Sequence, residues 1–402
     1  DHRDLHYPLR RQRQMCIRDR DSPKGIINKM KRPLKIILIP LLFTLSLLMS
    51  GQEKLNFKSQ LSAYTHLNPS NELYWTNGLR YIPQLNYQYS LSDKHRISFE
   101  ASANLYGNAA LAPFDSSYFS GDIKPYRFWA RYSTNQFELR AGLQKINFGS
   151  ASILRPLMWF DQIDPRDPLK LTDGVWGLLA RYYFLNNVNV WLWGLYGNEN
   201  LKGWETFISD KSIPEFGGRI QTPVPRGEAA FTYHHRLADC SILSDSSNTI
   251  GKVAENRFGF DAKFDMLIGW WIEASYSAYG KDIGMYSNRE IINLGADYTF
   301  SLGSGLTVIY EHLIVSLDEN PLAFENVSTF SLLNISYPLG LFDNISAIVY
   351  YDWENNKAYN FLNWQRVFNK FTLYLMAYIN PRDYNIPTPG SNDIIYAGSG
   401  VQ

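Results

Sequence analysis

The stretch Arg257-Phe258-Gly259-Phe260-Asp261-Ala262-Lys263-Phe264-Asp265-Met266 alternates at every residue between an apolar side chain and a charged residue or glycine. Successive side chains of a β-strand point to opposite faces, so Phe258 and Phe260 share one face while Arg257 and Asp261 share the other. An apolar face backed by a charged face is typical of a strand that separates lipid from water. The stretch therefore predicts a membrane-spanning β-strand.

Two further stretches, His95 to Tyr106 and Ile292 to Ser301, repeat this alternation. A helical membrane protein would instead need several continuous apolar spans of about 20 residues. Only Ile36 to Met49 comes near that length, and it lies at the amino-terminal side. The membrane-spanning elements are therefore expected to be strands.

Eight tight turns separate the expected strands, and much longer polar connections join one hairpin to the next. Such alternation is typical of outer-membrane barrels, which have short turns on the periplasmic side and long extracellular loops. The turns are Ser92-Asp93-Lys94, Thr134-Asn135-Gln136, Leu185-Asn186-Asn187, Pro223 to Gly227, Leu267 to Gly269, Leu302 to Gly305, Gly340 to Asp343 and Phe368 to Lys370.

Eight hairpins give sixteen strands, and Lys54 to His66 and Ile394 to Gln402 add a first and a last strand. The predicted fold is an all-β, antiparallel, up-and-down transmembrane β-barrel of eighteen strands. Sixteen strands is the alternative if the stretch from Pro214 to Gly227 is not a hairpin. Pro223 and Pro225 cannot donate to a strand ladder, so both are expected in a turn.

The amino-terminal part divides into two segments. Residues 1–29 are interpreted as a non-native or disordered extension without a function. Residues 30–51 combine a basic start, a short apolar core and small residues, which predicts a secretory signal peptide. The barrel is expected over residues 52–402, and its last strand is interpreted as truncated because it lacks a terminal aromatic residue.

The charge of the chain depends on this division. The whole chain has 39 basic and 38 acidic residues, and residues 1–51 contain eleven of the basic and four of the acidic ones. The remaining chain has a net charge of −6, which argues against nucleic acid as a partner. Only Cys240 remains, so no internal disulfide is expected there.

A basic wall is expected on the inward face of three neighbouring strands. If the alternating aromatic residues face lipid, then Arg127, Arg131, Arg140 and Arg181 face the lumen together with Glu138. Such charges bias ion selectivity when they line a pore. The alternative is that they form internal salt bridges that brace the barrel wall.

The third long connection, Ser150 to Asp173, is expected to contribute the opposite charge. Its acidic residues include Asp161, Asp164 and Asp167. It also contains the apolar residues Ile153, Leu154, Leu157, Met158, Trp159 and Phe160. An exposed apolar run of that kind promotes aggregation, so the connection is expected to be tucked inward.

A family resemblance comes from two segments, Leu139 to Gly149 and Asp161 to Pro168. They resemble the strand-and-loop signature of porin-like outer-membrane proteins of Gram-negative bacteria, including phosphate-selective-type porins and eighteen-stranded alginate-export-type barrels. The resemblance covers about 35 residues and implies an outer-membrane barrel. Phe148 departs from it, since Trp is frequent at that position. In general porins the third loop narrows the channel, so by analogy Asp161, Asp164 and Asp167 would face the arginine wall.

Enzymatic function is not expected. His234 and His235 are adjacent on an expected strand, so their side chains point to opposite faces and cannot share a metal ion. Gly303-Ser304-Gly305 is not followed by the lysine of a phosphate-binding loop. No cofactor is expected.

Three function classes stay open. The first is a channel for passive diffusion of small polar or charged solutes. The second is a dedicated oligosaccharide or polymer transport barrel, and the third is a plugged barrel with a structural or binding role. The expected partners are outer-membrane lipid and small solutes or ions, and a homo-oligomer is not distinguished from a monomer.

Overall fold

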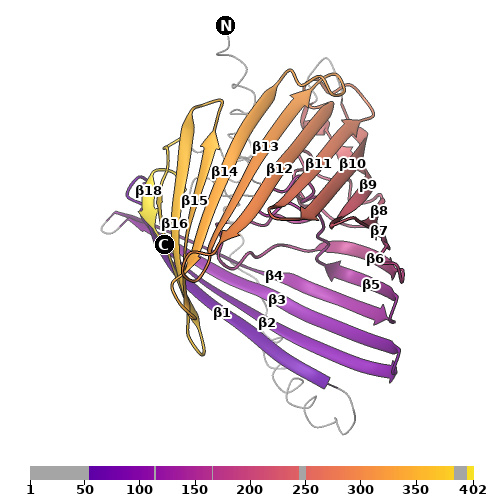
Figure 1. Cartoon of the computed structure of the whole chain (residues 1–402), viewed down its shortest axis with the longest axis horizontal. Helices are drawn as coiled ribbons and strands as arrows, with labels where there is room; N and C mark the ends of the chain where they lie inside the picture. The colour runs from indigo at the N-terminus through magenta and orange to yellow at the C-terminus, as the bar shows by residue number, and fades with distance from the viewer. Residues whose placement is uncertain (1–53, 113–114, 165, 244–249, 384–395) are drawn as a thin grey trace, which may run out of the picture. The chain divides into compact units, whose positions relative to one another are not determined.

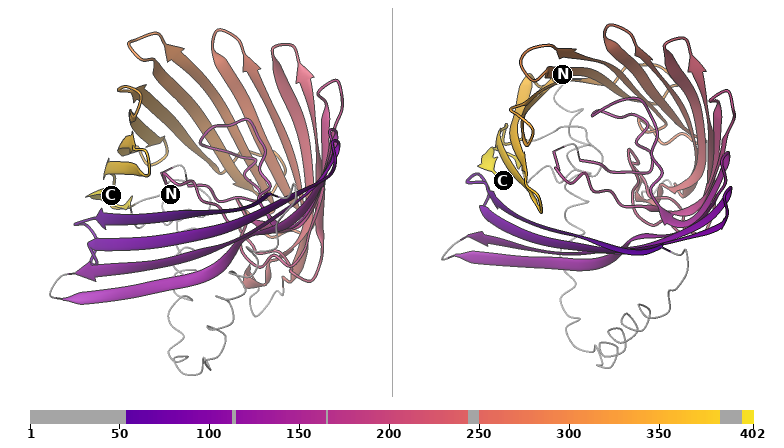
Figure 2. Two further views of the ribbon diagram at one scale, coloured as in Figure 1. Left: turned by 90° about the horizontal axis from the view of Figure 1, so that it is seen from below. Right: turned by 60° about the horizontal axis from the view of Figure 1, so that its bottom comes forward.

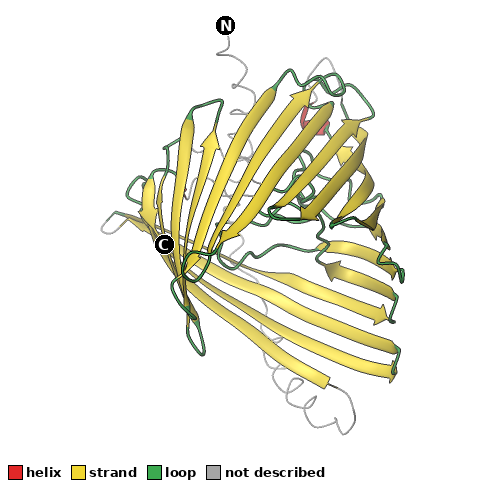
Figure 3. Ribbon diagram, viewed as in Figure 1, coloured by secondary structure: helices red, strands yellow, loops and turns green. Residues whose placement is uncertain are grey.

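The computed structural model describes residues 54–112, 115–164, 166–243, 250–383 and 396–402. These residues form a closed barrel in which every strand runs antiparallel to its neighbours (Figure 1). Apart from one short 3-10 helix, η2 (Ser241–Leu243), the described regular structure is entirely β-strand (Figure 3). The eighteen strands are β1 Lys54–Leu67, β2 Trp75–Ser92, β3 His95–Ala112, β4 Ser116–Ser133, β5 Phe137–Gln144, β6 Val175–Tyr183, β7 Asn189–Leu195, β8 Glu215–Val224, β9 Gly227–Asp239, β10 Lys252–Asp265, β11 Gly269–Tyr279, β12 Asn288–Phe300, β13 Leu306–Asp318, β14 Val327–Pro338, β15 Asp343–Asp352, β16 Lys357–Val367, β17 Thr372–Ile379 and β18 Ser399–Val401.

All eight predicted turns join consecutive strands, so the prediction of eighteen strands is confirmed and sixteen is wrong. The proline-rich stretch is the β8–β9 hairpin. Pro225 and Arg226 form its turn, and Arg226 has a φ of 61°. The prediction for Pro223 is wrong, because Pro223 lies in β8 opposite Glu228, one residue before the strand ends.

Two connections on the other side are much shorter than the sequence pattern suggests. Residues 113–115 join β3 to β4, and residues 353–356 join β15 to β16. The barrel closes where Leu67 of β1 pairs with Val401 of β18. The described part of the last strand is Ser399–Val401, shorter than the predicted one, whose first two residues lie outside the described ranges.

The predicted division of faces is confirmed for β10. The side chains of Phe258 and Phe260 are 40% and 44% exposed on the outer face, whereas Arg257 and Asp261 are 1% and 2% exposed. Strand β12 follows the same rule, since Leu294 is exposed and its neighbour Asn293 is buried. The outward apolar band is the surface that a bilayer would cover.

The apolar core lies within the ring of strands. Its largest cluster combines Leu154, from the connection between β5 and β6, with inward residues of β12 to β17. A second cluster joins Phe148, Trp159 and Phe160 of that connection to β6 and β7. Figure 2 shows chain segments between the strands running inside the ring.

Candidate functional site

The connection between β5 and β6, residues 145–174, is hydrogen-bonded to the opposite wall by two carboxylates. Glu311 on β13 accepts backbone N–H groups from Ser152 (2.7 Å), Ile153 (3.1 Å) and Leu154 (2.6 Å). A charged acceptor makes such hydrogen bonds stronger than neutral ones. The carboxylate therefore fixes three consecutive residues of the connection against β13.

Glu273 on β11 holds the flanking residues in the same way. Its two oxygens accept the backbone N–H groups of Ala151 (2.7 Å) and Leu157 (2.6 Å). Gly149 has a φ of +109°, and a Cβ added there would lie 2.4 Å from an oxygen of Glu273. Glycine is therefore required at this position both by the backbone and by the close approach of the carboxylate.

Side-chain contacts complete this anchorage. Asn293 on β12 donates to the carbonyl of Leu154 at 2.6 Å, and Trp159 donates through Nε1 to Ser275 on β11 at 2.9 Å. The Ser150 hydroxyl donates to a carboxylate oxygen of Asp261 on β10 at 2.8 Å. In the apolar run from Leu154 to Phe160, Leu154 and four other large side chains are each 1–3% exposed. The part of the connection from Leu154 to Asp161 is thus mostly buried, whereas Ser152, Pro168, Lys170 and Asp173 are exposed.

Three of the four predicted arginines gather around one carboxylate. Arg140 donates to Glu138 at 2.8 Å, while Arg131 and Arg181 each lie 3.7 Å from its oxygens. The strand register explains this: Arg131 pairs with Arg140, and Glu138 pairs with Arg181. Arg131, Glu138, Arg140 and Arg181 are therefore neighbours on the barrel wall, and their role in lining a pore stays a prediction.

Aromatic rings support the same guanidinium groups. Arg140 lies 4.8 Å and Arg131 lies 5.4 Å from the ring centre of Trp129, and Arg181 lies 3.8 Å from that of Trp191. Stacking of this kind suits the planar, weakly hydrated guanidinium.

The fourth arginine, Arg127, lies apart from this group. Its Nη2 donates to the carbonyl of Thr172 at 2.9 Å, and its guanidinium lies 4.0 Å from the ring centre of Tyr126. Its side chain is nearly buried. Arg127 therefore joins β4 to the end of the β5–β6 connection.

The acidic residues of the connection have partners close by. Asp164 forms two hydrogen bonds with Arg166 at 2.8 Å, and Asp167 accepts the backbone N–H of Leu169 at 2.9 Å. Asp161 lies 3.8 Å from Lys145. Within the described ranges, no ion pair joins these three carboxylates to the four arginines.

Burial changes the pKa of two of these acids. Asp161 is 2% exposed, and its burial raises the pKa of the carboxyl to about 6, although the positive charge of Lys145 opposes the change. Burial also raises the pKa of Asp167. Burial in turn lowers the pKa of Lys145.

A second connection, residues 196–214 between β7 and β8, was not identified from the sequence. Glu205 of this connection lies within 3.4 Å of Arg236 and 3.0 Å of Arg257, which also contact Glu255. All four side chains are at most 1% exposed. The alternation in β9 and β10 indicates inward charged residues, but nothing in the neighbouring sequence indicates that a distant glutamate neutralises them.

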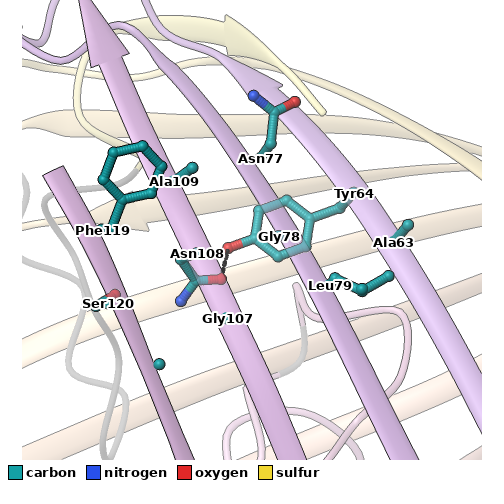
Figure 4. A pocket seen from close by; sticks show the side chains of 11 residues that line it. Ala63, Tyr64, Asn77, Gly78, Leu79, Gly107, Asn108, Ala109, Phe119 and Ser120 are labelled. Carbon is teal, nitrogen blue, oxygen red and sulfur yellow. Dashed lines mark hydrogen bonds between the residues drawn. The ribbon is translucent and has the colours of Figure 1, made fainter. Parts of the chain in front are cut away.

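Many polar side chains on the inward face of β1 to β5 are at least partly exposed. Figure 4 shows part of this face, where the Tyr64 ring of β1 crosses Gly78 of β2 and the Tyr64 hydroxyl donates to Oδ1 of Asn108 on β3 at 3.0 Å. A Cβ on Gly78 would lie 2.1 Å from that ring. Tyr64 itself stays 39% exposed.

Among the described residues, no group of three or more His, Cys, Asp or Glu side chains could hold a metal ion. In the same part of the chain, no helix is long and apolar enough to cross a membrane.

Comparisons with known proteins identify the fold. No protein-family model and no curated protein matches the chain. Among solved structures, the chain is similar to Wzi of Escherichia coli, a carbohydrate-binding β-barrel involved in group 1 capsule assembly, with a TM-score of 0.50, 11% identity, and coverage of 90% of this chain and 85% of that one.

Two other similar structures score lower. One is OmpT, an outer-membrane protein of Vibrio cholerae, with a TM-score of 0.49, 11% identity and coverage of 87% and 97%. The other is an anion-selective porin from Comamonas acidovorans, with a TM-score of 0.44, 11% identity and coverage of 86% and 98%. The similarity to Wzi and the closed antiparallel strand order show that the chain has the β-barrel fold found in outer-membrane proteins.

Proposed function

We propose that the barrel lies in an outer membrane and conducts small polar or charged solutes by passive diffusion through a lumen that residues 145–174 narrow. The observation that carries this proposal is the double anchorage by Glu273 and Glu311, which joins the connection to strands across the barrel from β5. A segment held by several charge-assisted hydrogen bonds is a stable obstruction in a lumen. The outward apolar band supplies the lipid contact.

In this proposal, the charged residues line the part of the lumen that residues 145–174 leave open. Arg131, Arg140, Arg181 and Glu138 form its basic side, and Arg127 connects that side to the obstruction. The acids Asp161, Asp164 and Asp167 belong to the obstruction itself. Charges in these positions would bias ion selectivity, while their mutual ion pairs also brace the wall.

A direct test is single-channel recording of the purified protein in planar lipid bilayers. Ohmic conductance steps are expected, and Glu311→Gln should widen or destabilise the open level because it weakens the anchorage. Glu228→Gln is the matched control, since Glu228 lies at the β8–β9 turn, away from the connection. Absence of steps from protein that is folded and inserted would contradict a channel.

The packed interior favours a second candidate, a plugged barrel with a binding role. Three apolar clusters and the buried ion pairs of Glu205 occupy space beside β6 to β17. Wzi, which is described as carbohydrate-binding, has a similar fold. Folded protein without conductance, but with sugar-dependent quenching of tryptophan fluorescence, would support this candidate.

A further inference from the structure

We propose that the solute path runs off the barrel axis, against the inward face of β1 to β5, and that this path favours small anions. The inference rests on the proposed channel and adds its position and its solute class. It follows from three observations: which inward surfaces are covered, which stay exposed, and what charge the exposed surface carries.

Much of the inward surface of β9 to β16 is covered. A set of fifteen inward side chains on these strands, both polar and apolar, is at most 5% exposed. The residues in question are Thr232, His234, Arg236, Glu255, Arg257, Asp261, Glu273, Ser275, Ser277, Asn293, Glu311, Leu313, Leu332, Tyr350 and Tyr359. Inward residues nearer the turns, such as Lys263, Asp297 and Asn363, are partly exposed.

Two connections provide the cover. Residues 145–174 hydrogen-bond to β10, β11, β12 and β13. Residues 196–214 add Glu205, which contacts β9 and β10, and Trp204, whose carbonyl accepts a hydrogen bond from Arg289 of β12. Buried carboxylates and guanidiniums without such partners would be strongly destabilising, so this cover is required for stability.

The inward surface of β1 to β5 has less cover. Lys58 and Gln60 of β1 are exposed, and Gln84 and Asn86 of β2 are partly exposed. Strand register places these residues on one face, since Lys58 pairs with Gln84 and Gln60 with Ile82. Polar side chains that stay exposed inside a barrel are the expected lining of an aqueous path.

The charge of this surface is predominantly positive. Inward positions of β1 to β5 with described side chains carry seven basic and three acidic residues. The basic residues are Lys58, Arg80, Arg96, Lys124, Arg127, Arg131 and Arg140, and the acidic ones are Glu100, Asp122 and Glu138. Beside them, Arg181 of β6 shares Glu138 with two of the arginines. An excess of fixed positive charge along a narrow aqueous path attracts anions and repels cations.

The path can be located by cysteine modification during single-channel recording. Gln60→Cys and Ser62→Cys place a thiol on the proposed path, and Leu61→Cys places one between them on the outer face, where Leu61 is 69% exposed. Ser277→Cys places one on the covered wall of β11. Wild-type protein, measured with and without the reagent, is the control for modification of Cys16 and Cys240.

A negatively charged methanethiosulfonate reagent should lower the conductance of Gln60→Cys and Ser62→Cys and shift the reversal potential in a KCl gradient toward cations. Leu61→Cys, Ser277→Cys and the wild type should not respond. A response of Ser277→Cys with none from residues 60 and 62 would overturn the position of the path. Cation preference of the untreated wild type would overturn the solute class, which needs no variant to measure. Absence of any conductance would overturn the proposed channel, and this inference with it.

Discussion

Replacing Glu311 by glutamine should release residues 152–154 from the barrel wall. The carboxylate is fully buried and accepts hydrogen bonds from three consecutive backbone N–H groups. Glutamine keeps one oxygen but replaces the other by an NH2 group. That group would face the N–H of Leu154 or Ser152, and two donors cannot bond to each other.

The cost can be estimated from these contacts. A hydrogen bond to a charged group contributes about 1.5–3 kcal/mol, and a buried donor left without an acceptor costs about 1–3 kcal/mol. Loss of the charge and of one acceptor should therefore lower the free energy of unfolding by about 3 kcal/mol. Glu290→Gln is the matched control. Glu290 on β12 accepts one backbone N–H, from Leu322 at 2.9 Å, so a smaller loss of about 1 kcal/mol is expected.

Urea unfolding in detergent, followed by tryptophan fluorescence, measures the stability, and limited proteolysis measures release of the connection. Glu311→Gln should unfold at lower urea concentration and be cleaved within residues 145–174 under conditions that leave the wild type intact. A loss no greater than that of Glu290→Gln, with unchanged protection, would show that apolar packing rather than the carboxylate holds the connection.

Four further substitutions test other parts of the structure. Combined replacement of Arg131 and Arg140 by alanine should shift the reversal potential toward cations, whereas an unchanged potential with a lower melting temperature would mean that they only brace the wall. Phe260→Arg should cost about 2–4 kcal/mol in lipid if the residue lies at mid-bilayer, and a cost near zero in folding experiments would contradict its assignment to the lipid face. Gly149→Ala should cost about 1–3 kcal/mol because of its positive φ and the adjacent carboxylate, and wild-type unfolding midpoints would refute that reading. The pKa of Asp161 is raised from 3.8 to about 6, so the folded chain binds a proton that the unfolded chain has released; this contribution of about 3 kcal/mol is fully present below pH 3.8 and is lost as pH rises through 6. Asp161→Asn should remove that slope, and parallel pH profiles of unfolding midpoints for variant and wild type would disprove it.

The strands and turns could be predicted because both depend on local sequence. Alternation in β10 sorts side chains by face, and polar or glycine-containing turns such as Leu302 to Gly305 interrupt it. The assignment of Pro223 to the turn was wrong, because a proline can lie near the end of a strand without changing the alternation of apolar and polar residues. The inward arginines were also predictable, since Arg131 and Arg140 follow from the same period.

The partners of the loop acids could not be predicted in this way. Asp164 bonds to Arg166, two residues away, because a loop can curl its own charges together. Conversely, the alternation in the sequence places Glu273 and Glu311 on the inward face and indicates nothing more about them. Their actual partners are backbone N–H groups more than 100 residues away, and a backbone N–H has no signature in the sequence.

The same polar-inward alternation therefore serves two environments in one barrel. On β1 to β5, a lysine such as Lys58 stays exposed and needs no partner from a loop. On β10 to β13, Glu255 and Glu311 are fully buried, and each buried charge needs partners to offset several kcal/mol of lost hydration. The connections at 145–174 and 196–214 supply those partners, whereas only three residues of sequence separate Ala112 of β3 from Ser116 of β4. Lengthening that short connection with an anchored polar segment should then close the proposed path, whereas shortening 196–214 should first cost stability, because it would leave Arg236 and Arg257 without Glu205.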